Sequence, residues 1–254
     1  MKQSTPLLEK DGAQTASQPL LELNNVVAGY GPTPVLFDVN MSVNEGDIAC
    51  LLGRNGVGKT TLLRSIIGLN PLDGGSISFA GKDISKDATY QRARQGIAYI
   101  PQGREVIPYL SVLDNLKMGL SASGKKARTK GDGIPNELYE FFPMLKEHLN
   151  RQGGLLSGGQ QQQLAIARGL MCNPKIMLLD EPTEGIQPSI VQEIEDTLRR
   201  INQEKGITIV VVEQKIEFAR KLAQKFFIMK KGSIVENGTT DQLSDELLKK
   251  YLAV

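Results

Sequence analysis

Two hydrophobic periods alternate along the chain. Short apolar runs and stretches of alternating apolar and polar residues predict β-strands, whereas apolar residues three or four positions apart predict helices. The predicted strands are 21–27, 35–43, 48–52, 76–80, 96–100, 176–179 and 207–212, followed by a hairpin that turns at 230–233. The predicted helices are 62–67, 112–120, 136–149, 164–171, 190–201, one that ends at Ala223 and a closing one over 241–251. This alternation of strands and helices favours an α/β fold.

Three stretches depart from the alternation. Residues 21–27 and 35–43 flank the turn Gly29-Tyr30-Gly31-Pro32, which predicts an antiparallel pair beside the phosphate-binding site described below. From about 103 to 161 only helical spacing occurs, which indicates a helical insertion. Residues 1–18 are polar and aperiodic, which is typical of a disordered leader. We therefore expect one domain over 19–254, with a core formed by 19–102 and 162–254.

Composition and charge narrow the classes of function. With 40% hydrophobic and 23% charged residues, the chain can bury a full core. No apolar run approaches the roughly 20 residues that span a bilayer, and a signal-peptide core is missing, so we expect a cytosolic chain. A net charge of +2 does not suggest nucleic acid as the main partner. The basic cluster 125–130 is most simply a solvated loop, with a docking patch as the alternative. Two isolated cysteines, Cys50 and Cys172, suit a reducing compartment.

A glycine-rich turn follows the apolar strand 48–52 and precedes a helix. It matches the phosphate-loop pattern G-x-x-x-x-G-K-[ST] in the required strand–loop–helix context. Its residues are Gly53, Arg54, Asn55, Gly56, Val57, Gly58, Lys59, Thr60 and Thr61. Glycines let successive N–H groups converge on one anion, and the helix N-terminus adds partial positive charge. We expect Lys59 to contact the β- and γ-phosphates and the Thr60 hydroxyl to bind Mg²⁺.

Two adjacent carboxylates, Asp180 and Glu181, end the buried strand 176–179. Such a pair is costly without a cation, and open α/β sheets bind ligands at the carboxyl ends of their strands. Neighbouring side chains of a strand point in opposite directions, so the two can act separately. We expect Asp180 to hold Mg²⁺, directly or through water, and Glu181 to orient and deprotonate an attacking water.

Three weaker signals surround these motifs. Tyr30 either stacks on adenine or packs as a turn tyrosine. Gln102, at the end of strand 96–100, either binds Mg²⁺ or a water or is a surface residue. The third signal is a helix start that combines a capping box with two glycines, which predicts a second anion site; its residues are Ser157, Gly158, Gly159 and Gln160. We expect the rest of the glutamine run, to Gln163, to form a solvated helix face.

Taken together, these motifs resemble those of the ATP-binding subunits of ABC transporters. GRNGVGKTT, Tyr30, Gln102, LSGGQ and IMLLDEP occur in the family's order, and the resemblance extends from Leu21 onward. It implies a P-loop NTPase fold with a RecA-like core, an antiparallel β subdomain and a helical insertion. It further implies ATP and Mg²⁺ as cofactors, with Gln102 sensing Mg²⁺ and the membrane subunit.

The resemblance also implies partners. The active form would be a head-to-tail dimer, homodimeric or with a paralogue, in which residues 157–160 close on the γ-phosphate held by the other subunit. Membrane-spanning permease subunits would bind it at the inner face of the plasma membrane, and a solute-binding protein outside the membrane would act indirectly. The apolar cluster 106–109, beside Gln102, either receives the permease or packs within the insertion.

Two departures from the family pattern point to one branch. Gln214 stands where the family usually has a switch histidine, and His148, the chain's only histidine, lies in the insertion. The loop after Glu181, residues 183–188, carries Gln187 where aspartate is usual. Both features resemble the hydrophobic amino-acid and urea uptake branch, and the sequence is most similar to its urea subunits. Gln214 can hydrogen-bond a phosphate but lacks an imidazolium's charge.

The sequence therefore predicts an ATPase that drives an importer, with Glu181, Gln214 and Gln102 in catalytic roles. Urea is the expected solute. The alternatives are a branched-chain amino-acid importer, and a soluble ABC ATPase that acts on a scaffold outside the membrane.

Overall fold

Two β-sheets organise residues 18–122 and 133–252, the part of the chain that the computed structural model describes. The six-stranded sheet has the order β10-β9-β3-β8-β7-β6, and its strands from β9 to β6 run parallel. Its strands are β3 (Ile48–Leu52), β6 (Ile97–Ile100), β7 (Ile176–Asp180), β8 (Thr208–Glu213), β9 (Lys225–Lys230) and β10 (Ser233–Thr239). This parallel sheet fulfils the expectation of an α/β fold.

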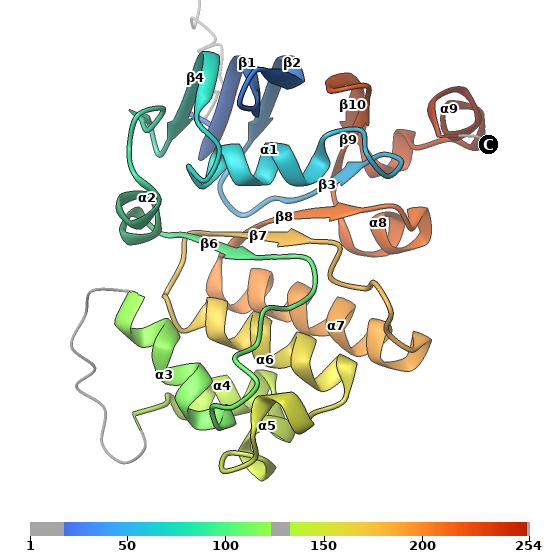
Figure 1. The fold of residues 1–254 in the computed structure, drawn as a ribbon. Coiled ribbons are helices and arrows are strands. Elements are labelled where there is room, and N and C mark those ends of the chain that lie inside the picture. The colour runs from blue at the N-terminus through green and yellow to red at the C-terminus, as the bar shows by residue number, and fades with distance from the viewer. Residues whose placement is uncertain (1–17, 123–132, 253–254) are drawn as a thin grey trace, which may run out of the picture.

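Helices cover both faces of the six-stranded sheet (Figure 1). Helix α1 (Lys59–Ile66) lies between this sheet and the four-stranded one, while α6 (Gly158–Leu170) and α7 (Pro188–Lys205) lie on the opposite side. Because both faces are covered, β3, β7 and β8 are buried along their whole length. The carboxyl ends of these strands carry the loops that contain the predicted site.

The four-stranded sheet is antiparallel, with the order β2-β1-β4-β5. Its strands are β1 (Leu21–Tyr30), β2 (Thr33–Val43), β4 (Leu72–Phe79) and β5 (Lys82–Asp83). Strand β4 starts at Leu72 and not at Ser76, so Gly74 and Gly75 lie inside it. Gly75 has φ +76°, and a Cβ there would lie 2.2 Å from the carbonyl oxygen of Asn25. The glycine thus allows a close crossing where the β1–β4 register shifts.

The region between β6 and α6 is helical, as predicted, but one of the expected helices is divided into two. Helix α3 spans Val112–Ala122, whereas the expected helix over 136–149 is divided into α4 (Asn136–Phe141) and α5 (Pro143–Glu147). Pro143 causes the break, because the residue before a proline is driven out of the helical region, and Phe142 has φ −133° and ψ 66°. A short 3₁₀ turn, Gly153–Leu155, precedes α6.

Two further helices differ from the sequence prediction. Helix α2 (Thr89–Gln95) was not predicted, because its only buried residue is an arginine, Arg92, and no apolar period marks it. Helix α9 (Asp245–Tyr251) starts after a 3₁₀ turn at Thr240–Gln242, and Ser244 caps it through Leu247 N. Helix α8 (Ile216–Leu222) ends at the expected position and precedes β9.

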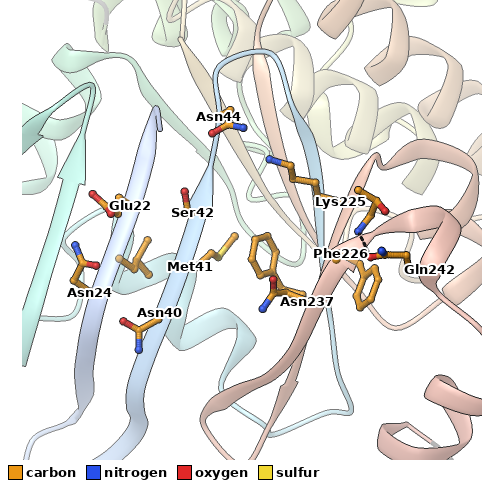
Figure 2. A pocket seen from close by; sticks show the side chains of 14 residues that line it. Glu22, Asn24, Asn40, Met41, Ser42, Asn44, Lys225, Phe226, Asn237 and Gln242 are labelled. Carbon is orange, nitrogen blue, oxygen red and sulfur yellow. Dashed lines mark hydrogen bonds between the residues drawn. The ribbon is translucent and has the colours of Figure 1, made fainter. Parts of the chain in front are cut away.

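A polar groove of about 640 Å³ lies where the two sheets separate. Glu22, Asn24 and Ser42 line its wall on β1 and β2, and Lys225 and Asn237 face them from β9 and β10 (Figure 2). The groove shares no lining residue with the cavity above the glycine-rich loop, which is described below.

Within the described residues, no helix is both long and apolar enough to cross a membrane. The predicted leader, apart from Gln18, and the basic cluster 125–130 lie outside those residues. The division into a core and an insertion stays a prediction.

Candidate functional site

The glycine-rich loop links β3 to α1, as expected. Gly56 and Gly58 have φ of +77° and +111°, which favours glycine at both positions. Gly58 is the N-cap of α1, and no side chain caps the helix there. The first N–H groups of α1 are therefore available to an anion.

A cavity of about 440 Å³ opens above this loop. Its lining contains residues of the loop together with three predicted residues from distant segments, Tyr30, Gln102 and Glu181. Tyr30 is 49% exposed, and its hydroxyl lies 3.3 Å from Thr61 Oγ1. Its ring therefore borders the cavity and is not packed inside the turn.

Lys59 lies at the bottom of the cavity and is only 4% exposed. Its Nζ donates to the carbonyl oxygens of Gly53 and Arg54, at 2.9 and 3.0 Å, and forms an ion pair with Glu181 Oε1 at 3.2 Å. Lys59 lines the cavity, and its positive charge is largely desolvated. An anionic ligand in the cavity would therefore interact strongly with it, in competition with Glu181.

Asp180, at the end of β7, is almost fully buried. Its Oδ1 accepts from Thr60 Oγ1 and its Oδ2 accepts from the Tyr99 hydroxyl, both at 3.2 Å. Burial raises the pKa of Asp180, against the lowering effect of these two hydrogen bonds. The oxygens of Asp180 and Thr60 are hard donors of the kind that Mg²⁺ prefers, so the residues present fit this cation.

Tyr99 was missed by the sequence reasoning. Burial also raises the pKa of its hydroxyl, so the group stays protonated and acts as a donor to Asp180. The available signal was a hydroxyl within the otherwise apolar strand β6, next to β7.

Glu181 follows the last residue of β7 and has φ +46°, which is unusual for a non-glycine residue. The expected alternation of strand side chains therefore does not apply to it. Besides Lys59, two amides approach its carboxylate. Gln214 Nε2 donates to Oε1 at 3.0 Å, and Gln102 Nε2 lies 3.4 Å from Oε2. The structure thus brings together the three residues expected to be catalytic, and the carboxylate is held by donors from three segments.

Two more carboxylates complete the site and were not predicted. Glu184 Oε2 accepts from Gln102 Nε2 at 2.8 Å. Glu213 is buried and accepts from the backbone N–H and hydroxyl of Thr183, at 3.1 and 2.8 Å, so it fixes the loop after Glu181. Burial raises the pKa of Glu213, and the Thr183 bonds lower it in part. Its signal was its position, directly at the end of a buried strand like Asp180.

Residues 157–160 form the predicted capping box at the start of α6. Gln160 N donates to Ser157 Oγ at 3.3 Å, and Ser157 N donates to Gln160 Oε1 at 3.0 Å. None of the four residues lines the cavity. A Cβ on Gly159 would lie 2.6 Å from Ile190 Cγ2, so helix packing already accounts for this glycine.

Two surface predictions need revision. The glutamine run is not a solvated face, because Gln162 and Gln163 are 3% and 9% exposed and Gln163 Nε2 donates to Glu193 Oε2 at 3.1 Å. These polar side chains lie between α6 and α7. In the cluster 106–109, Val106 packs against the core, whereas Tyr109 is 84% exposed. Packing within the insertion therefore accounts for Val106 but not for Tyr109, and the permease contact stays a prediction.

Comparison with known proteins gives consistent results. The profile of the family described as "ABC transporter" matches residues 36–184. The chain is 38% identical to the high-affinity branched-chain amino acid transport ATP-binding protein BraG of Pseudomonas aeruginosa, over 87% of this chain and 93% of BraG. It is 35% identical to the lipopolysaccharide export system ATP-binding protein LptB of Escherichia coli, over 91% and 95%. It is 34% identical to the probable branched-chain amino acid transport ATP-binding protein LivF of Archaeoglobus fulgidus, over 85% and 90%.

Among solved structures, the fold is similar to the dimeric, post-hydrolysis ATP-binding cassette MJ0796 bound to ADP and Pi. The TM-score is 0.78 at 27% identity, and the match covers 87% of this chain and 98% of that one.

Proposed function

The chain belongs to the ABC transporter family and is an ATPase, and from this premise we propose that it supplies the energy for a membrane importer of branched-chain amino acids. One observation supports the catalytic part of this proposal. Lys59 and Glu181 form an ion pair and line the same cavity as Gln102 and Tyr30. The names of two relatives, BraG and LivF, support the solute. Urea, the solute expected from the sequence, is named in none of the relatives just described.

We assign the residues as follows. The loop 53–61 would hold the phosphates of ATP through backbone N–H groups and Lys59, and Tyr30 would stack on the adenine. Asp180 and Thr60 would hold Mg²⁺, with Gln102 as a further oxygen donor. When bound, the cation neutralises phosphate charge.

Glu181 is placed to accept the proton of an attacking water. In this structure its carboxylate pairs with Lys59 and accepts a hydrogen bond from Gln214. A phosphate in the loop would compete for Lys59 and so free Glu181 for the reaction. The lysine would thereby link binding of the nucleotide to availability of the base.

The two half-sites fit a dimer. Ser157, Gly158, Gly159 and Gln160 start a helix but do not line the cavity of their own chain. We propose that they close on the γ-phosphate held by a second ATP-binding subunit. The similarity to a dimeric cassette supports this arrangement.

We place the permease contact next to Gln102. Tyr109 and Leu155 are 84% and 61% exposed, and the segments that carry them meet where Gly154 N donates to the carbonyl oxygen of Pro108 at 2.9 Å. Exposed large apolar side chains of this kind mark protein contacts. The subunit would then act at the inner face of the plasma membrane, with a solute-binding protein as an indirect partner.

Nucleotide binding is tested with Lys59→Ala. This variant should lose tight ATP binding and hydrolysis, measured by titration calorimetry and phosphate release, because the buried ammonium is removed from the cavity. Lys86→Ala removes an exposed lysine and is the matched control. Normal ATP affinity of the Lys59 variant would disprove the phosphate-loop assignment.

The solute and the partner need separate tests. Uptake of labelled leucine and of labelled urea, in cells with and without the chain, distinguishes the two importers. Co-purification with detergent-extracted membrane subunits distinguishes either importer from an ATPase that acts on a soluble scaffold. Uptake of urea alone would restore the sequence-based expectation.

A further inference from the structure

A second cavity, of about 500 Å³, lies between the first turns of α7 and the start of α8. Its walls are mostly apolar: Ile186, Pro188, Val191, Ile216 and Phe218. It shares no residue with the lining of the nucleotide cavity. A volume of this size suits a small organic molecule.

A carboxyl group lies in this apolar cavity. Glu195 lines it and is only 3% exposed, and its Oε2 is buried without a hydrogen-bond partner among the described residues. Burial raises the pKa of Glu195. An unpaired buried carboxyl group is unfavourable, so a ligand nitrogen that pairs with the carboxyl group of Glu195 would gain a charge-assisted hydrogen bond.

The charged residues at the rim do not satisfy Glu195. Lys221 lies close enough to influence it electrostatically, but no ion pair between the two occurs in the described part of the chain. Lys215 is engaged elsewhere, because its Nζ donates to the carbonyl oxygen of Thr183 at 3.2 Å. Glu195 therefore lacks an ion-pair partner among the described residues, although two lysines line the same cavity.

The same lysine connects the cavity to the catalytic loop. Lys215 lines the cavity and contacts Thr183, which is also held by Glu213. Next to Lys215, Gln214 donates to Glu181. A ligand between α7 and α8 would therefore touch the segment that holds the catalytic carboxylate in place.

We propose that this cavity binds a small organic cation, consisting of an apolar body and one protonated nitrogen group that pairs with Glu195. Occupancy should change the rate of ATP turnover through Lys215 and Thr183. This second statement rests on the proposed ATPase site, whereas the binding statement does not.

The first experiment uses benzamidinium as the probe and neutral benzamide as its isostere, with binding followed by chemical-shift titration without nucleotide. Wild-type protein should bind benzamidinium saturably and about tenfold more tightly than benzamide, because only the former supplies a charge-assisted pair. Glu195→Gln should remove that preference. Glu217→Gln, which changes an exposed carboxylate of the same lining, should keep it.

Two further variants serve as controls for this experiment. Val191→Trp should fill the cavity and abolish binding with Glu195 intact, which covers the case that Glu195→Gln fails to fold. Lys59→Ala should bind benzamidinium as the wild type does, so a failure of the proposed ATPase function stays distinguishable. The proposal is overturned if wild-type protein shows no saturable binding, if benzamide binds equally well, or if Glu195→Gln keeps the preference.

Discussion

At the scale of single residues, Glu181 shows how the site is arranged. Its backbone adopts φ +46°, and its carboxylate meets donors from the phosphate loop, the end of β6 and the end of β8. A left-handed conformation at a glutamate costs about 1 kcal/mol or more, and the surrounding contacts must compensate for it. The position of this one side chain therefore depends on several loops at once.

Gln214 donates to the carboxylate of Glu181 from the end of β8. Replacing it by leucine should lower the kcat of ATP hydrolysis about tenfold and leave KM nearly unchanged, because Glu181 loses a neutral donor but the nucleotide loop is intact. Gln214→His should retain most of the activity, since an imidazole can donate the same bond. Steady-state kinetics of both variants provide the comparison, and an unchanged kcat for Gln214→Leu would refute this role.

Residues with local signals could be predicted, and those that depend on tertiary contacts could not. The glycine loop and the Asp180–Glu181 pair follow from spacing and strand position. Tyr99 contributes only because β6 lies beside β7, and Glu184 only because its loop turns back to Gln102. Neither neighbourhood is encoded within a few residues of the side chain itself.

At the scale of elements, a proline and an arginine determine where helices end or form in two places that the hydrophobic period does not reveal. The strands β3, β7 and β8 were predictable because buried parallel strands form continuous apolar runs. Pro143 indicated a break in the helix, but the prediction followed the helical spacing of apolar residues on both sides of it. The sequence of helix α2 has no apolar period, since its only buried residue is Arg92.

Arg92 joins two elements through four carbonyl oxygens. It donates to those of Ser65 and Ile66 at the end of α1, both at 2.8 Å, and to those of Ser85 and Asp87 at 3.0 and 2.9 Å. It thus supplies partners that the last turn of α1 lacks.

Arg92→Met should therefore destabilise the protein by about 3 kcal/mol, because buried carbonyls lose their donors. Arg94→Met, on the exposed side of the same helix, should cost less than about 0.5 kcal/mol. Urea denaturation of the two variants measures the difference. Equal stabilities would show that Arg92 does not hold α1 in place.

At the scale of the whole molecule, the two proposed halves of the nucleotide site do not meet within one chain. The phosphate loop opens into a cavity on one side, and the start of α6 lies outside its lining. The family resemblance already implied that the two halves belong to different subunits, and the fold is consistent with this, since the start of α6 lies outside the cavity. The proposed complete site therefore needs a second subunit.

The dimer has a direct consequence. Ser157→Arg should leave ATP binding unchanged but reduce ATP-dependent dimer formation and hydrolysis by about tenfold or more, because a large cation would occupy the place of the partner's γ-phosphate. Ser42→Arg, at an exposed serine on β2, should behave like the wild type. Light scattering with and without ATP records the mass, and normal dimerisation of the Ser157 variant would contradict the shared site.

The most direct test of the catalytic assignment is the rate of ATP hydrolysis by Glu181→Gln, measured on a sample whose ATP affinity is determined in parallel. Glutamine keeps the size of the side chain but cannot accept the proton of water at neutral pH. We expect wild-type ATP affinity and a rate lowered about a hundred- to ten-thousand-fold. Hydrolysis at the wild-type rate would show that Glu181 is not the base and that the chemistry of this cavity has been assigned to the wrong residue.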